Sequence, residues 1–287
     1  MKIVRWRCEE CTNFGDELNL WLWPRLLPGF FDQDESSLFL GIGSILGMFT
    51  FPQTARKIVF GSSYVPEYCP ILPDLGGANW DIVFVRDART ASLLSLDPAL
   101  ALGDPAILVR LAEPPNPLAT HSVAFMPHWS SMYRGRWPEV CEIAGIKLID
   151  PRQDVAQILA EIQGSQQLIT EALHGAIVAD ALRVPWLPVI PLEFNHRAKW
   201  APWARSMDIE LRPLPLKSSH WAESGIRGAT KVMRRVPCSS LLSDLLVDRA
   251  ARHLKKLACE SPYLSALPVL DRATERILNL LNSVSAR

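Results

Sequence analysis

The sequence predicts an α/β protein with two Rossmann-like domains that face a cleft, followed by a helical tail. Short, continuously apolar runs recur along the chain, Gly-, Pro- and Asp-rich turns separate them, and several intervening segments are long enough for crossover helices. Apolar runs of this kind are typical of parallel strands that are covered on both faces of a sheet. A proline-rich stretch at residues 113–117 divides the pattern and is the best candidate for a linker.

The first domain is expected to span residues 1–117. Its candidate strands are residues 1–7, 38–43, 57–62, 80–87 and 103–109, each of them short and mostly apolar. Residues 17–27 and 88–96 lie between candidate strands and are expected to form crossover helices.

The second domain, residues 118–235, repeats the alternation. Strands are expected at 122–128, 146–150, 167–170 and 186–190, and helices at 154–162 and from about residue 172. Residues 236–287 change character and form the predicted tail. A helix with leucines along one side is expected to begin near Ser239–Ser240, and a second one to span 272–284. Two α/β halves joined by a linker favour ligand binding in the cleft between them.

The composition excludes several classes of protein. Thirty basic residues balance thirty acidic ones, so no chain-wide basic field for nucleic acid is expected. No segment reaches the ~18 uncharged apolar residues of a membrane helix, and the start lacks the apolar run of a signal peptide. We therefore expect a cytoplasmic protein with mostly reduced thiols. Cys8 and Cys11 form a single C-x-x-C pair without a second pair or a histidine pair, which favours turn residues over a redox or metal site.

The segment 169–182 carries the clearest chemical signal. It places His174 and Gly175 at the expected start of an apolar helix. The N–H groups of a helix start attract anions, and a histidine can transfer a proton near neutral pH. The segment therefore predicts a site that holds an anionic substrate during a proton transfer.

Several short motifs follow one another in a characteristic order from about residue 13 to about residue 190. They are Asn13-Phe14-Gly15-Asp16, Gly41–Leu46, Arg86–Thr90, Gly103–Ala106, Pro127-His128, Ile149–Pro151 and Leu173-His174-Gly175. This ordered set resembles the polysaccharide pyruvyltransferase family, especially bacterial exopolysaccharide ketal pyruvyltransferases. The resemblance implies a fold like that of the GT-B glycosyltransferases, and transfer of a pyruvyl group from phosphoenolpyruvate to two hydroxyls of one sugar, with release of phosphate.

The resemblance also implies the partners. Phosphoenolpyruvate is the donor substrate, so no cofactor and no metal are expected. The acceptor is a lipid-linked oligosaccharide at the inner face of the cytoplasmic membrane. The basic residues of the tail, Arg249, Arg252, Lys255 and Lys256, could touch anionic lipid, although a solvated helix face is the simpler interpretation.

Three residues around the His174 helix are expected to take part in catalysis or binding. His174 is the expected general acid or base, and its alternative is a structural histidine at a helix start. Gly175 is expected to let a ligand come close, or else to allow helix packing. Glu171 is expected to orient His174 or to bind the acceptor. Many relatives carry an arginine where this chain has Ala172. A cation on the polar loop after the last strong strand could replace it, and of His196, Arg197 and Lys199 we expect Lys199.

Other residues that are expected to contact a substrate lie directly after predicted strands. The Arg86 fork could bind phosphate or carboxylate through two bonds, or it could pair with Asp87. Asp16 is expected to accept the proton of a sugar hydroxyl, with helix capping as the alternative. The remaining predicted substrate-binding residues are Asn13, Gly15, Gly43, Ser44 and His128. The alternative for His128 is structural packing near the linker, and the alternative for the glycine turn is that it only makes the turn tight.

Two rival functions remain open at this point. A nucleotide-sugar glycosyltransferase of the same architecture would share the two α/β halves and the anion site at a helix start. A non-catalytic family member in a polysaccharide synthase complex would fit the alanine at position 172. Binding of phosphoenolpyruvate and turnover separate both rivals from a pyruvyltransferase.

Overall fold

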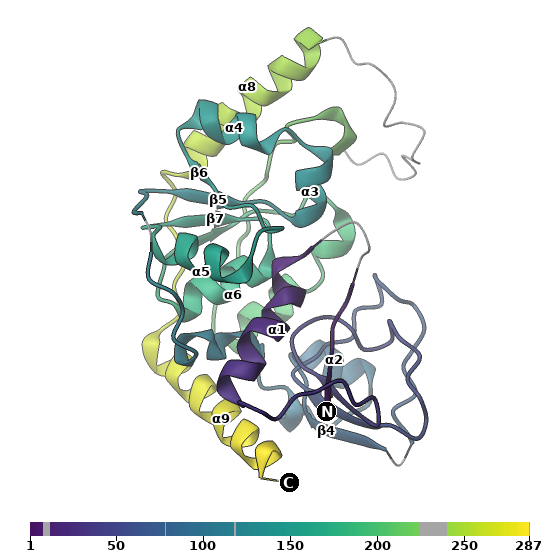
Figure 1. Ribbon diagram of the computed structural model, residues 1–287. Helices are drawn as coiled ribbons and strands as arrows, with labels where there is room; N and C mark the ends of the chain where they lie inside the picture. Colours follow the sequence, from purple (N-terminus) through teal and green to yellow (C-terminus); the bar gives the residue numbers. More distant parts are fainter. Residues whose placement is uncertain (8–11, 78, 118, 224–239, 287) are drawn as a thin grey trace. The chain divides into compact units, whose positions relative to one another are not determined.

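The computed structural model describes the chain except residues 8–11, 78, 118, 224–239 and 287, and it divides into two compact units (Figure 1). The first unit comprises Met1–Pro114, Ala198–Leu211 and Ser265–Arg287, and the second comprises Pro115–Arg197 and Arg212–Leu264. The predictions for Cys8, Cys11 and Ser239 fall outside the described residues. The chain leaves the first unit within the proline-rich stretch.

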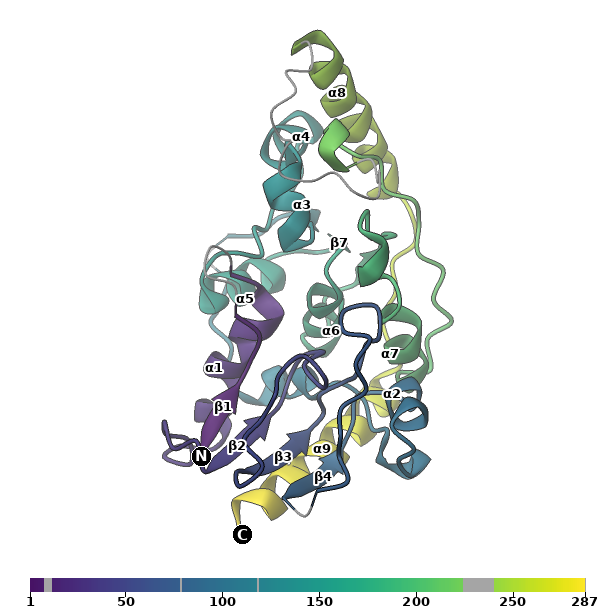
Figure 2. The same cartoon turned by 90° about the vertical axis from the view of Figure 1, so that its right-hand side faces the viewer.

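The first unit contains a four-stranded sheet in which every strand pair is parallel. Its strands are β1 (Lys2–Val4), β2 (Ser37–Leu40), β3 (Arg56–Phe60) and β4 (Trp80–Phe84). Figure 2 shows them side by side in chain order. Four of the strands predicted for this part of the sequence are therefore confirmed.

Helices and loops cover both faces of this sheet. On one face, helix α1 (Phe14–Leu26) packs the ring of Trp23 edge-on against Phe39 and Phe60. On the other face, an apolar cluster joins β2, β3, the loop after β2 and helix α2 (Ala88–Leu93). The unit also contains α7 (Trp200–Ser206) and the 3-10 helix η1 (Pro98–Leu100). Coverage on two faces explains why these strands are continuously apolar.

The strand predicted at residues 103–109 is wrong. The structure forms a 3-10 helix there, η2 (Pro105–Leu111). The Oδ1 atom of Asp104 accepts a hydrogen bond from the backbone N–H of Ala106 at 3.0 Å, and Pro105 occupies the first helical turn. An acidic cap followed by proline is a helix-start signal, and it overrides the apolar run that follows.

The second unit contains another four-stranded parallel sheet. Its strands are β5 (Ala124–Met126), β6 (Lys147–Leu148), β7 (Leu168–Thr170) and β8 (Trp186–Pro188). Their order in the sheet is β6-β5-β7-β8, so the chain reverses its direction across the sheet once. The four strands predicted for this domain are confirmed, as is the α/β class of the whole chain.

Pairs of helices cover the two faces of this sheet (Figure 1). Helices α5 (Val155–Gln163) and α6 (Leu173–Ala181) lie on one face. Helices α4 (Trp137–Ala144) and α8 (Ser240–Leu257) lie on the other, where an apolar cluster joins them to the strands. Helix α3 (Trp129–Arg134), helix α4 and the 3-10 helices η3 (Phe194–His196) and η4 (Trp221–Glu223) were not predicted, because each is too short for a clear helical period.

The two helices predicted in the tail are present, and they belong to different units. Helix α8 is part of the second unit, whereas α9 (Leu267–Ser285) is part of the first. Each helix has an apolar stripe that is buried in the unit it joins. The buried residues of α9 are Leu270, Thr274, Ile277, Leu281 and Val284. Among the described residues, none of the helices has the length and apolar character needed to cross a membrane.

Candidate active site

The carboxyl edge of the second sheet contains a topological switch point between β5 and β7. From β5 the chain moves to β6 on one side, and then crosses to β7 and β8 on the other. Loops that leave neighbouring strands in opposite directions open a crevice, which is where open α/β sheets bind ligands. His128 follows β5 and His174 follows β7. The described strands of the first sheet follow chain order and have no such reversal.

His174 lies in the first turn of α6, as predicted. Ala172 is the N-cap residue and provides no side-chain cap for the helix. The turn before it is held by Thr170, whose Oγ1 atom accepts from the N–H of Ala172 at 3.0 Å. The positive end of the helix dipole therefore lies beside a largely buried imidazole, which is 9% exposed. The acid or base role of His174 stays a prediction.

Gly175 permits close packing of α6 on the sheet. A Cβ atom at this position would lie 2.6 Å from Oγ1 of Thr170 and 2.7 Å from Sδ of Met126. Both distances are too short for a real side chain, so the helix needs glycine here. The geometry favours the packing interpretation, and close approach of a ligand at Gly175 is still untested.

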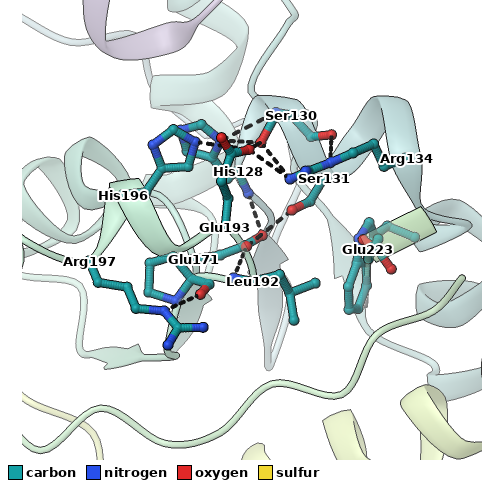
Figure 3. Close-up of polar contacts among 12 residues, drawn as sticks. His128, Ser130, Ser131, Arg134, Glu171, Leu192, Glu193, His196, Arg197 and Glu223 are labelled. Carbon is teal, nitrogen blue, oxygen red and sulfur yellow. Dashed lines mark hydrogen bonds and ion pairs between the residues drawn. The ribbon is translucent and has the colours of Figure 1, made fainter. Parts of the chain in front are cut away.

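Glu171 joins the loops that follow three strands (Figure 3). Its Oε2 atom accepts from the N–H of His128 at 2.8 Å, while Oε1 accepts from Oγ of Ser131 at 3.0 Å and from the N–H of Leu192 at 2.8 Å. The side chain is buried, and this burial raises its pKa even though the three hydrogen bonds oppose the shift. Glu171 thus has a structural function, since it holds these three loops together. The roles predicted for it, orienting His174 or binding the acceptor, stay predictions.

A second carboxylate, Glu193, contacts cationic and polar side chains at the same carboxyl edge of the sheet (Figure 3). Its Oε2 atom lies 2.9 Å from Nη2 of Arg134, 3.4 Å from Oγ of Ser130 and 3.6 Å from Nε2 of His196. The interaction with His196, together with the charge of Arg134, lowers the pKa of Glu193 to about 2. The imidazole of His196 in turn lies against that of His128, with ring centroids 3.7 Å apart and ring planes inclined by 32°.

Glu193 and Arg134 were not predicted from the sequence. Glu193 follows β8 by a few residues, so its position after a predicted parallel strand was the available signal. Arg134 lies at the end of the unpredicted helix α3 and had no such signal. The structure brings both to His128, which the sequence did predict.

Glu223 lies in η4 of the same unit, and its surroundings should make the free energy of unfolding depend on pH. Its oxygens accept from Nε1 of Trp137 at 2.6 Å and from the N–H and Oγ of Ser219 at 2.7 Å each. Burial raises the pKa of this carboxyl from 4.5 to about 7 against the effect of these bonds. The folded protein therefore keeps a proton that the unfolded chain loses at lower pH.

As the pH rises from about 4.5 to about 7, we expect the free energy of unfolding to fall by about 3 kcal/mol from this group. Glu223→Gln cannot ionise and should remove most of this fall. Urea unfolding of both proteins over this pH range measures the effect. If the free energy of unfolding falls equally in both proteins over this pH range, Glu223 is not the group responsible.

Predicted residues of the first unit gather after β1 and β2. Nδ2 of Asn13 donates to Oδ2 of Asp16 at 2.5 Å, and a Cβ atom on Gly43 would lie 3.4 Å from Oδ1 of Asp16. Asn13, not Asp16, is the N-cap residue of α1, so the capping interpretation of Asp16 is wrong. Gly15 is buried in the first turn of α1, and Ser44 accepts from Oγ of Ser63 at 3.0 Å.

Arg86 is buried between two carboxylates of the first unit. Its Nε atom donates to Oδ2 of Asp87 at 3.2 Å, and Nη1 lies 3.9 Å from Oδ2 of Asp104. The predicted alternative of a local ion pair is therefore present. Within the described residues, however, Nη1 and Nη2 make no hydrogen bond, although buried donors are normally satisfied. An anionic ligand would satisfy them, and donor binding by Arg86 stays a prediction.

Lys199 is the N-cap residue of α7 in the first unit. Its Nζ atom lies 5.6 Å from the centre of the Tyr68 ring, within the range of a cation–π interaction. Its predicted role as a replacement cation is untested. The tryptophans of the same helix, Trp200 and Trp203, are core residues at 3% and 0% exposure.

The comparisons with known proteins agree with the motif order. A family model described as polysaccharide pyruvyl transferase matches residues 78–191. The succinoglycan biosynthesis protein ExoV of Rhizobium meliloti (strain 1021) is 37% identical over 230 residues, which cover 80% of this chain and 72% of that protein. The chain belongs to the polysaccharide pyruvyl transferase family. It is therefore a transferase, and no solved structure matches it.

The pyruvyl transferase model covers part of the predicted site. Of the predicted residues, Arg86, His128, Glu171, His174 and Gly175 lie inside the matched region, and the others lie outside it. Glu193 and His196 follow its last residue closely. Within the portion of the chain that the structure describes, no group of three or more His, Cys, Asp or Glu side chains could hold a metal ion.

Proposed function

We propose that this protein transfers a pyruvyl group from phosphoenolpyruvate to two hydroxyls of one sugar in an exopolysaccharide repeat unit. Membership of the polysaccharide pyruvyl transferase family supports the reaction class, and the relative named for succinoglycan biosynthesis supports a polysaccharide acceptor. The observation that carries the proposal is the position of His174 at the uncapped start of α6, beside the switch point of the second sheet.

The reaction requires one proton donor and groups that accept two protons. Protonation of the methylene carbon of phosphoenolpyruvate creates a methyl group and an electrophilic carbon. The oxygen of one sugar hydroxyl bonds to this carbon and loses its proton, and phosphate leaves with the electron pair of the broken C–O bond. The second hydroxyl adds to the same carbon, loses its proton and closes the ketal ring. We assign the acid or base step at the donor to His174.

The proposed acceptor is lipid-linked and is reached at the inner face of the cytoplasmic membrane. Exposed basic residues on α8 support contact with an anionic surface. They are Arg249, Arg252, Lys255 and Lys256.

Incubation of the purified protein with phosphoenolpyruvate and lipid-linked oligosaccharide tests the proposal. Phosphate release that depends on the acceptor, together with an acceptor that gains the mass of a pyruvate ketal, is the expected result. Saturable binding of a nucleotide sugar without binding of phosphoenolpyruvate would instead indicate a glycosyltransferase. Phosphate release no faster than in the absence of acceptor would indicate a non-catalytic protein.

Arg86→Lys tests the donor contact predicted for Arg86. The lysine keeps a positive charge beside Asp87 and Asp104 but loses the two-pronged geometry that suits phosphate and carboxylate. We expect phosphoenolpyruvate to bind about tenfold more weakly or worse, the scale of a lost charge-assisted hydrogen bond. Isothermal titration calorimetry measures the affinity.

Arg56→Lys is the matched control for this variant. Arg56 pairs with Asp81 at 2.7 Å in the same unit and is far more exposed than Arg86. This control should bind the donor like the unmodified protein. Unchanged donor affinity in a folded Arg86→Lys variant would assign Arg86 to the local ion pair alone.

A further inference from the structure

Two carboxylates at the carboxyl edge of the second sheet have different surroundings (Figure 3). Glu171 accepts from two backbone N–H groups and one hydroxyl, all of them neutral. Glu193 instead contacts the guanidinium of Arg134 at 2.9 Å and approaches the imidazole of His196 at 3.6 Å. Glu193 is therefore suited to hold positive charge at this edge, whereas Glu171 fixes the loops.

Ser130 provides one connection from Glu193 to His128. The Oγ atom of Ser130 lies 2.8 Å from Nδ1 of His128 and 3.4 Å from Oε2 of Glu193. A hydroxyl has one proton to donate. The backbone N–H of Ser130 also donates to Nδ1 of His128, at 3.3 Å, and Nη2 of Arg134 donates to the Ser130 hydroxyl at 3.2 Å. Nδ1 is therefore an acceptor, and the extra proton of the pair belongs on His196, whose Nε2 atom faces Glu193. The arrangement thus fixes the tautomer and the orientation of the His128 ring.

His196 provides the second connection. The rings of His128 and His196 are inclined by 32°, their centroids are 3.7 Å apart, and both residues are buried. Two imidazolium ions at this distance would repel each other strongly, so the pair is expected to hold one extra proton rather than two.

The other charged or titratable groups of the surrounding elements determine the net charge near the His128–His196 pair. They are Tyr133 and Arg134 on α3, Glu171 after β7, His174 and Asp180 on α6, Glu193 before η3 and Arg197 after it. The charge of Arg134 offsets that of Glu193, with which it pairs. A protonated His128–His196 pair would therefore add a positive charge at the switch point.

We propose that Glu193 is a positioning residue for the reaction proposed above. Acting through Ser130 and His196, it orients the imidazole of His128 and favours the charged form of the His128–His196 pair, which attracts the anionic donor. This inference rests on the proposed function for the identity of that donor. A pKa of about 2 keeps Glu193 ionised over the whole range in which histidines titrate.

Glu193→Gln tests the proposal because it removes the charge and keeps the shape of the side chain. The ring signals of His128 and His196, followed by NMR in the full-length protein with labelled histidine, should titrate about one pH unit lower than in the unmodified protein. Affinity for phosphoenolpyruvate, which requires the charged pair, should be lost as the pH rises, and this loss should also begin about one unit lower. Calorimetry at several pH values measures the second effect.

Three further variants sharpen the test. Glu193→Asp keeps the charge and should restore most of the pH dependence. Ser130→Ala removes one connection without removing a charge, so it should lower kcat severalfold while the pH dependence of donor affinity changes little. Glu139→Gln is the matched control, because Glu139 pairs with Arg136 on the surface of α4 and should leave both measurements unchanged.

A folded Glu193→Gln variant with the ring titrations and donor-binding profile of the unmodified protein would overturn the proposal. Unchanged kcat in Ser130→Ala would overturn the connection through the hydroxyl. If the unmodified protein does not bind phosphoenolpyruvate at any pH, the proposed function fails. In that case the NMR titration alone still decides whether Glu193 controls the charge of the histidine pair.

Discussion

His174→Ala is expected to lower the rate of pyruvyl transfer roughly 10²–10⁴-fold, the usual contribution of a group that transfers a proton in the transition state. His174 lies in the first turn of α6, beside the switch point, where an anionic donor and an acid or base are both favoured. Turnover of phosphoenolpyruvate with a lipid-linked acceptor measures the loss. Because the ring is largely buried, circular dichroism and thermal unfolding must first show that the variant is folded.

His253→Ala provides the matched control for this prediction. His253 belongs to α8 of the same unit, and its Nε2 atom lies 2.7 Å from the backbone oxygen of Pro215. This variant should keep the turnover of the unmodified protein. A folded His174→Ala variant with normal turnover would remove His174 from the mechanism.

Glu171→Ala is expected to destabilise the second unit by about 3–5 kcal/mol. The substitution leaves three donors without their acceptor in a buried position, namely the N–H groups of His128 and Leu192 and the hydroxyl of Ser131. Each buried donor that loses its partner costs about 1–3 kcal/mol, with partial relief from rearrangement. Hydrogen exchange of the amides in β5, β7 and β8 reports the stability of this unit separately from the other.

Glu171→Gln separates the structural role from a chemical one. The amide keeps one oxygen acceptor, so its cost should be smaller, about 1–2 kcal/mol. Glu161→Ala is the stability control, because Glu161 contacts the partly exposed Lys147 at 2.9 Å and the exposed Gln157 at 3.3 Å, and its loss should cost about 1 kcal/mol or less. If folded Glu171→Gln loses as much turnover as His174→Ala, the carboxylate takes part in the reaction as the sequence predicted.

The strands could be predicted because their signal is local. Residues 58–60 and 168–170, for example, are consecutive apolar side chains or small polar ones that meet covered faces on both sides. The failure at residues 103–109 shows the limit of that signal, since an apolar run alone does not separate a strand from a short buried helix. The deciding residues were Asp104 and Pro105 before the run.

The site could be predicted only in part. His174 is recognisable because a histidine at an apolar helix start suggests an acid or base beside an anion site. His128 was also predicted, but it has a local role as well, since its side chain caps α3 by accepting from the N–H of Ser130. Glu193, Arg134 and His196 depend on contacts between the loops after β5 and β8, which are more than fifty residues apart in sequence. No local pattern reports such contacts, because parallel strands bring distant segments to one edge of a sheet.

The sequence by itself determined the α/β class, the strands of both sheets, the family and the helix start that carries His174, since all of these depend on residue order within short windows. Only the tertiary structure decided that the tail helices join different units and that Gly175 is needed for packing. It also decided that Glu171 and Glu193 have opposite surroundings. These features depend on which distant side chains become neighbours, and burial then sets the pKa and the hydrogen-bond partners of each carboxylate.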